Sequence, residues 1–220
     1  MRSIPAIVVG IAEKWRVEWP RPGFRIDLAA TVILVVIAAL GTLRVSNFVQ
    51  ARTGVVLPDP VLAMFEPRPL QWQTHVMMYG LVFSAIVHLL PTPRRFLMAW
   101  QGWAVVLCFR MLGMLIAPFE APPAIIPILD PLAQQAADVE PIIDDLFFSG
   151  HTATAFLLVL FARRWWVKML FLAVTVSIAA AIMLQHVHYT VDIYCAPVFA
   201  YVSYRMVLNA HPGAEDQPDA

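Results

Sequence analysis

Six apolar segments, each close to the length of a membrane-spanning helix, constrain this chain more than any other feature of its sequence. A helix needs about 20 apolar residues to cross the hydrocarbon core of a bilayer. Hydrophobic residues occupy 60% of the 220 positions and charged residues only 14%, whereas soluble domains carry about 25% charged residues. The sequence therefore predicts an all-α, polytopic membrane protein with six transmembrane helices in a bundle. The predicted spans are residues 27–49, 72–90, 96–118, 146–162, 167–186 and 189–208.

Polar stretches divide the chain into three parts. Residues 1–26 hold a short apolar stretch followed at once by Glu13 and Lys14. This pattern predicts a cytoplasmic amphipathic segment on the membrane surface, with Trp15 and Trp19 at headgroup level. Residues 27–208 form the six-span domain, and residues 209–220 are expected to be a disordered polar tail.

The distribution of basic residues predicts the orientation in the membrane. Lysine and arginine gather in the N-terminal region, in the second loop and in the fourth loop, whereas residues 119–145 carry six acidic residues and no lysine or arginine. The positive-inside rule places both termini and the even-numbered loops in the cytoplasm. The first, third and fifth loops then face a periplasm or an organelle lumen, and the sequence leaves that choice open.

Net charge and cysteine content give little support to nucleic-acid binding or to a disulfide framework. Lysine plus arginine and aspartate plus glutamate number 15 each, so the net charge gives no indication of nucleic-acid binding. The two cysteines, Cys108 and Cys195, lie in apolar runs and are expected to be packing residues. No cofactor is implied. Homo-oligomerisation is left open.

Ionisable residues gather at the predicted outer ends of the last three spans. Such residues are costly inside a membrane and usually serve function. His188 and Asp192 are four positions apart, so on a helix they would share a face and pair. His151 follows Ser149 and Gly150 at a predicted helix start, where backbone N–H groups favour an anion. A second histidine opposite a His–Asp pair is typical of phosphoryl transfer through a phosphohistidine.

Other interpretations use the same residues. The histidines and the carboxylate could satisfy one another inside a bundle without any chemistry. A zinc site built from His151, His186, His188 and Asp192 has suitable ligand types. A transporter could use histidine and aspartate as a proton relay, but its polar residues should run through the bilayer, and here they lie at one face.

Two stretches of the sequence resemble a known family. "DDLFFSGHT" and "HYTVDIYCAPVFAY" are similar to the third and fourth motifs of the sphingomyelin synthase family, lipid headgroup phosphotransferases within the type-2 phosphatidic acid phosphatase superfamily. Upstream, "VVLPDP" around Asp59 and "CFRMLGM" around Arg110 resemble its first two motifs. The resemblance covers most of residues 50–205 and implies that residues 27–208 are a six-span sphingomyelin synthase-like catalytic domain.

The resemblance also implies residue roles. His188 would attack the phosphorus of a phospholipid, Asp192 would orient it, and His151 would protonate the departing diacylglycerol oxygen. Ile182 stands where the phosphatase superfamily places an arginine upstream of its second histidine, so the phosphate charge must be met elsewhere. The residues expected to contact substrate are Asp145, Ser149, Gly150 and Arg110.

The expected partners are therefore lipids. A phospholipid would donate its phosphorylated headgroup, and a lipid alcohol such as ceramide or a diacylglycerol-like molecule would accept it. With water as acceptor, the same residues would make a phospholipase C or a lipid phosphate phosphatase. Both reactions share the first step, so the sequence does not separate them.

Overall fold

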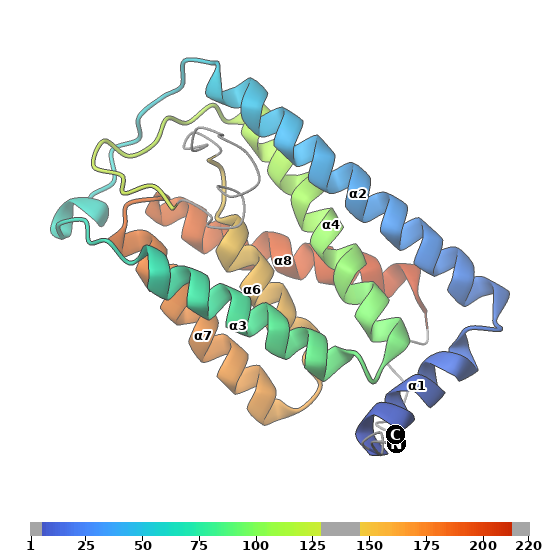
Figure 1. Ribbon diagram of the computed structural model, residues 1–220. Coiled ribbons are helices and arrows are strands. Elements are labelled where there is room, and N and C mark those ends of the chain that lie inside the picture. Colours follow the sequence, from blue (N-terminus) through green and yellow to red (C-terminus); the bar gives the residue numbers. More distant parts are fainter. Residues whose placement is uncertain (1–5, 129–145, 213–220) are drawn as a thin grey trace.

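The computed structural model describes residues 6–128 and 146–212. This part of the chain is helical except for its links and one isolated parallel bridge between Val55 and Phe119 (Figure 1). The predicted all-α class is therefore confirmed. The elements are α1 (Ala6–Glu18), α2 (Pro22–Gln50), the 3₁₀ turn η1 (Leu62–Met64), α3 (Gln71–Leu89), α4 (Pro93–Ile116), α6 (Gly150–Phe161), α7 (Trp165–Leu184) and α8 (Thr190–Ala210).

The short helix α6 lies at the centre of the bundle. It packs against α3, α4, α7 and α8, while α2 packs along the outer side of α4 (Figure 1). Its inward residues are small or aliphatic, and Ala153, Ala155 and Leu157 are all 0% exposed. Packing against four other helices explains how a helix of 12 residues, too short to be stable alone, is held in place.

Four helices are long and apolar enough to cross a membrane: α2, α4, α7 and α8. The outward face of α2 exposes Val32, Ile33, Val36, Ile37 and Leu40, as a lipid-facing helix would. Helix α3 has a polar first turn, and α6 is a shorter apolar helix of 12 residues. All six predicted segments are helical, but only four of them meet the length and apolarity of a span.

The links between the helices gather at two opposite ends of the bundle (Figure 1). One end carries α1, the α3–α4 turn and the α6–α7 turn, and the other carries residues 51–70, 117–128, 146–149 and 185–189. At the first end, the indole N–H of Trp15 donates to the carbonyl of Leu90 at 2.8 Å. The Trp15 ring also meets Phe24 and Phe96 edge-on at 5.9 Å. Trp15 thus anchors α1 to the bundle. The headgroup-level position of Trp15 and Trp19 stays a prediction.

Candidate active site

His188 and Asp192 form a buried pair at the start of α8. Nδ1 of His188 lies 3.2 Å from Oδ2 of Asp192, and their side chains are 5% and 1% exposed. An ionised carboxylate can only accept hydrogen bonds, so the imidazole carries its proton on Nδ1 and presents the lone pair of Nε2. This arrangement orients a histidine to act as nucleophile or base.

The two residues do not share a helix, and the expectation that they would do so is wrong. Helix α8 begins at Thr190 with Tyr189 as its N-cap, so His188 belongs to the preceding link. Asp192 is the third helical residue, and its Oδ2 also accepts the backbone N–H of Tyr189 at 3.1 Å. The carboxylate therefore fixes the helix start and the imidazole together, as in a capping box.

A non-helical segment, residues 146–149, leads into α6 and is bonded to two buried charged side chains. The N–H of Phe148 donates to Oδ1 of Asp192 at 3.2 Å, and its carbonyl accepts from Arg110 at 2.9 Å. The N–H of Ser149 donates to the carbonyl of Asp192 at 3.1 Å. Because these partners satisfy the backbone without a helix, the predicted span 146–162 is helical only from Gly150.

Three non-glycine residues have positive φ in the described part of the chain, and all lie in the links beside this pair. They are Phe147 (107°), Phe148 (45°) and His186 (55°). The Phe148 ring stacks on Phe199 at 4.5 Å, and a Cβ on Gly113 would lie 2.0 Å from the Phe147 ring. Backbone of this kind persists where its surroundings over-determine it, and such sites are often functional.

The first turn of α6, which carries His151, lies against the side chain of Arg110 from α4. The Ser149 hydroxyl caps the helix by accepting the N–H of Thr152 at 3.3 Å. A Cβ on Gly150 would lie only 2.9 Å from a guanidinium nitrogen of Arg110, so the glycine permits this close approach. Arg110 is 6% exposed, which shows that it faces the bundle interior and not lipid.

A cavity of about 310 Å³ joins these side chains. His151, His188, Arg110 and Gly150 all line it, although they come from α4, α6 and the α7–α8 link. The other lining residues are Met78, Val106, Leu107, Ile125, Pro127, Ile128, Thr154 and Val187. The cavity therefore combines two imidazoles, one guanidinium and a helix start within an otherwise apolar wall, which is a suitable setting for a phosphoryl group.

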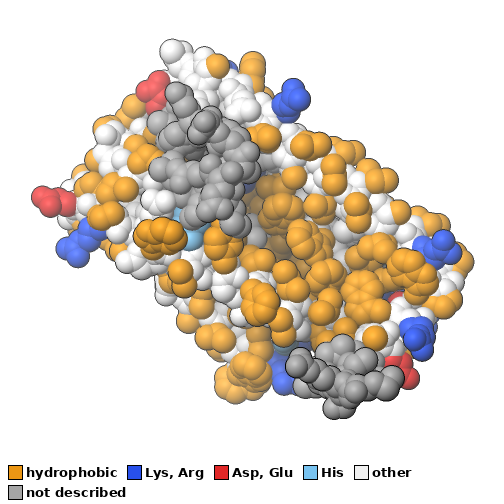
Figure 2. All heavy atoms as spheres, viewed as in Figure 1, with side chains coloured by type: hydrophobic (Ala, Val, Ile, Leu, Met, Phe, Trp, Pro, Cys, Tyr) orange, Lys and Arg blue, Asp and Glu red, His pale blue; other side chains and the backbone are white. Residues whose placement is uncertain are grey.

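An apolar groove of about 340 Å³ continues from this cavity between α3 and α4, with α6 as its floor. The two spaces share Met78, His151 and Thr154. Figure 2 shows this hollow as a hydrophobic recess in the face of the bundle. The remaining wall is almost entirely apolar and includes Val82, Ala85, Ile86, Leu89, Phe96, Ala99, Trp100, Trp103, Leu157 and Leu158.

Asp59 fastens the link between α2 and α3 to the start of α8. Its Oδ2 accepts the N–H of Thr190 at 2.7 Å, and its Oδ1 accepts the Thr190 hydroxyl at 3.0 Å. Oδ1 also accepts the N–H of Val61 and of Leu62, so the carboxylate folds its own loop as well. Burial alone would raise the pKa of Asp59, but the hydrogen bonds from Thr190, Leu62 and Val61 outweigh it and lower the pKa.

Two further histidines have different surroundings. The His186 ring is 6% exposed, packs edge-on against Phe65 at 5.5 Å and does not line the cavity. His75, on α3, lies in the apolar groove, where its Nδ1 is 2.8 Å from the carbonyl of Gln71. Among the described residues, Nε2 of His75 has no hydrogen-bond partner although it is buried.

Two further predictions concern Asp145 and a zinc site. Asp145 lies beyond the described residues, so its placement as a substrate contact stays a prediction. Within residues 6–128 and 146–212, no group of three or more histidine, cysteine or carboxylate side chains is placed to hold a metal ion. The predicted zinc alternative therefore finds no ligand set in that part of the chain.

Sequence reasoning missed several residues that shape the site. The Tyr189 hydroxyl accepts the N–H of Leu57 and donates to the carbonyl of Glu120. His75 lines the apolar groove. Its position in an apolar helical face, one turn before Tyr79, is the only signal that could have marked it.

One comparison with known proteins gives a match in this region of the chain. Residues 144–210 match the family model described as "PAP2 superfamily C-terminal". This match contains His151, His188 and Asp192. Residues 144–210 are therefore similar to a PAP2 superfamily C-terminal domain, the domain found in sphingomyelin synthase-related proteins, and the match covers less than half of the 220 residues. No curated protein and no solved structure gives a significant match to the chain.

Proposed function

We propose that this protein transfers a phosphorylated headgroup from a phospholipid to a lipid alcohol through a phosphohistidine intermediate. One observation carries the proposal: the His188–Asp192 pair shares a cavity with His151 and Arg110, and this cavity opens into an apolar groove. The domain match over residues 144–210 supports a lipid-modifying enzyme.

In the first step, Nε2 of His188 attacks the phosphorus of the donor lipid. The bond between phosphorus and the diacylglycerol oxygen breaks, and His151, as an imidazolium, gives its proton to that oxygen. Asp192 stabilises the positive charge that develops on the His188 ring as Nε2 bonds to phosphorus. Diacylglycerol then leaves, and the headgroup phosphate stays bound to His188.

In the second step, His151, now neutral, takes the proton from the acceptor hydroxyl. The hydroxyl oxygen attacks the phosphorus, and the bond between phosphorus and Nε2 breaks. His188 regains its lone pair and His151 its proton, so the enzyme returns to its first state. Water as acceptor would complete the same cycle as a phospholipase C or phosphatase.

Arg110 and the start of α6 are the proposed phosphate contacts. The guanidinium already lies against Gly150, so both groups can meet the same phosphoryl oxygens. Ser149 acts indirectly in this proposal, because its hydroxyl is used to cap α6. The Arg110 charge takes the place of the superfamily arginine that Ile182 replaces.

The apolar groove is the proposed path for the acyl chains. It reaches His151 from the side of the bundle, and its wall between α3 and α4 offers no charged side chain among the residues that line it. The buried Nε2 of His75 is placed in this groove to accept a hydrogen bond. A lipid alcohol whose chain lies in the apolar groove could supply the hydroxyl donor at this position.

We further propose that α3 and α6 also cross the membrane, giving six spans with both termini in the cytoplasm. Helix α6 has 12 residues and is about 18 Å long, less than the ~30 Å of the hydrocarbon core. Residues 146–149 would then lie at membrane depth. Non-helical backbone is tolerated there when it is buried, and Phe148 and Ser149 are 0% exposed with their N–H groups bonded to Asp192.

The test uses purified protein with phospholipids labelled in the headgroup, with and without ceramide or diacylglycerol. We expect label in a new lipid only when the acceptor is present, and acid-labile label on the denatured protein before the acceptor is added. Both signals should vanish in His188→Ala. The matched control is His186→Asn, because His186 is a buried neighbour outside the cavity and asparagine tolerates its positive φ.

The outcomes separate the candidates. Water-soluble phosphorylated headgroup released regardless of acceptor would make the protein a lipase. Full activity in His188→Ala would contradict both reactions.

A further inference from the structure

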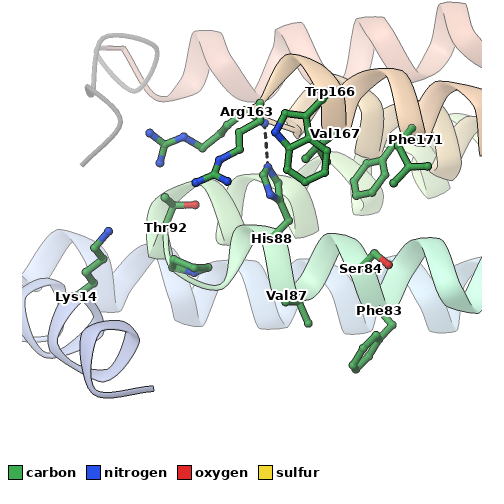
Figure 3. Close-up of a pocket in the computed structure, with 13 residues that line it drawn as sticks. Lys14, Phe83, Ser84, Val87, His88, Thr92, Arg163, Trp166, Val167 and Phe171 are labelled. Atoms are coloured by element: carbon green, nitrogen blue, oxygen red, sulfur yellow. Dashed lines mark hydrogen bonds between the residues drawn. The ribbon is translucent and has the colours of Figure 1, made fainter. Parts of the chain in front are cut away.

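A second cavity, with a basic lining, lies at the end of the bundle opposite His188. Its volume is about 530 Å³, and it lies between α3 and α7 with Lys14 of α1 at its edge (Figure 3). Its polar lining includes Lys14, His88, Arg163 and Arg164. Among the 13 lining residues, all of them described, there is no aspartate or glutamate.

His88 and the α6–α7 turn form the floor of this cavity. Nε2 of His88 accepts the backbone N–H of Arg163 at 3.1 Å, drawn as a dashed line in Figure 3. Since Nε2 is the acceptor, the ring proton lies on Nδ1 and gives the cavity a further donor. Helix α7 begins at Trp165, so its unpaired N–H groups and the positive end of its dipole lie at the same turn.

Positive charge is concentrated around this turn. Burial, together with the guanidinium groups of Arg95 and Arg164, lowers the pKa of Arg163. Glu13 and Glu18 of α1 lie beside this turn, and Glu18 pairs with Arg94 at 3.0 Å and also with Arg21. An anion bound in the cavity would face the side chains of Lys14, Arg163 and Arg164 and be attracted by their charges.

The side of the cavity away from the arginines is apolar and open. Phe83 of α3 and Trp166 and Leu170 of α7 line it and are 69%, 50% and 54% exposed. Arginine with a hydrophobic wall beside it suits an amphiphilic anion better than a free inorganic ion.

We propose that this basic cavity binds the phosphoryl group of a phosphoester, carried by an anionic phospholipid whose acyl chain lies along Phe83, Trp166 and Leu170. Arg163 and Arg164 hold the phosphoryl oxygens, and His88 donates from Nδ1. The site is separate from the His188 cavity, and it extends beyond the proposed transferase activity. Its occupancy can be measured without any turnover.

The experiment uses Trp166, which lies in the wall, as a reporter. Brominated phosphatidic acid and brominated phosphatidylcholine are titrated into the protein in detergent, and tryptophan quenching is compared between the parent and Trp166→Phe to isolate this residue. We expect half-quenching of Trp166 at roughly tenfold lower concentration of phosphatidic acid than of phosphatidylcholine. In Arg163→Gln/Arg164→Gln this preference should disappear.

Two variants control for folding and for general surface charge. Arg163→Lys/Arg164→Lys keeps the charges and should stay close to the parent, and the bond to His88 is kept in both doubles because it uses backbone. Arg16→Gln/Arg25→Gln removes two exposed charges from the same end, outside the cavity, and should leave quenching unchanged. The proposal would be overturned if Arg163→Gln/Arg164→Gln kept the preference for phosphatidic acid over phosphatidylcholine. It would also be overturned if Arg16→Gln/Arg25→Gln lost this preference to the same extent.

A competition arm identifies the source of the phosphoryl group. Glycerol phosphate that relieves quenching only at far higher concentration supports the lipid. Relief at a concentration similar to that of phosphatidic acid would overturn the acyl-chain contact and assign the site to a soluble phosphoester.

Discussion

The carboxylate of Asp192 holds His188 from a different structural element: it lies in the first turn of α8, while the imidazole, 3.2 Å away, lies in the preceding link. The same carboxylate accepts the N–H groups of Tyr189 and Phe148. One side chain therefore fixes the candidate nucleophile, the start of α8 and the approach to α6. This shared role makes Asp192 the residue where stability and catalysis are most closely linked.

Asp192→Asn should lower kcat by roughly 10²- to 10⁴-fold. The amide can turn its NH₂ group toward Nδ1 of His188, which shifts the ring proton to Nε2 and removes the nucleophilic lone pair. Headgroup transfer by the purified variant measures the loss, and thermal unfolding of the same sample shows whether the protein is still folded. Activity within about threefold of the parent would contradict the assigned tautomer.

The transfer rate should follow a bell-shaped pH profile, because His188 must be neutral and His151 protonated in the first step. His151→Ala should lose about 10²- to 10⁴-fold in rate and also lose one limb of the bell. Initial rates across the pH range, at saturating donor lipid, provide the measurement. A profile that is flat for the parent enzyme would count strongly against a two-histidine mechanism.

Asp59→Ala should destabilise the contact between the α2–α3 link and the start of α8 by about 1–3 kcal/mol, because it removes the acceptor of the Thr190 N–H and hydroxyl. The pKa of Asp59 is lowered in the folded state. Its stabilising effect should therefore be fully present above the pKa of the unfolded chain and be lost as pH falls through the folded value. Thermal unfolding of parent and Asp59→Asn against pH tests this, since the asparagine variant should lack that acid dependence.

His75→Leu should impair transfer to a lipid alcohol more than it impairs hydrolysis by water. Leucine fills the groove but cannot accept a hydrogen bond. The hydroxyl of the lipid alcohol then loses Nε2 of His75, a buried atom with no other hydrogen-bond partner among the described residues. The ratio of transferred to released headgroup should fall about tenfold, with the KM for the acceptor raised. An equal fall in both reactions would instead indicate a purely structural role for His75.

Gly150→Ala should reduce activity, whereas Gly80→Ala should not. A methyl group at position 150 would lie 2.9 Å from the Arg110 guanidinium and displace it, while a methyl group at position 80 meets no atom within 4 Å. Gly80 lies in the interior of α3 and Gly150 is the first residue of α6, so the comparison of activity is read together with the unfolding temperature of each variant. An activity loss of about tenfold at position 150, with unfolding temperature kept, is the expected result. Equal activity of the two variants would argue against phosphate binding by Arg110.

Local pattern was sufficient for much of the fold. Each apolar run that predicted a span became a helix, since a helix satisfies its own backbone and needs no distant partner. The all-α class and the approximate bounds of α2, α3, α4, α7 and α8 follow from that alone. The spacing of His188 and Asp192 correctly brought them together, although a helix start and not a shared helical face does so.

What the sequence determined by itself is therefore the helical membrane-type architecture and the identity of the polar residues at one end of the last three spans. The tertiary structure decided the rest. It alone shows that α6 begins only at Gly150, that Asp59 binds Thr190 and that His75 and His151 line one groove. The physical reason is distance along the chain: these hydrogen bonds and cavities join residues up to 131 positions apart, and no local pattern encodes them.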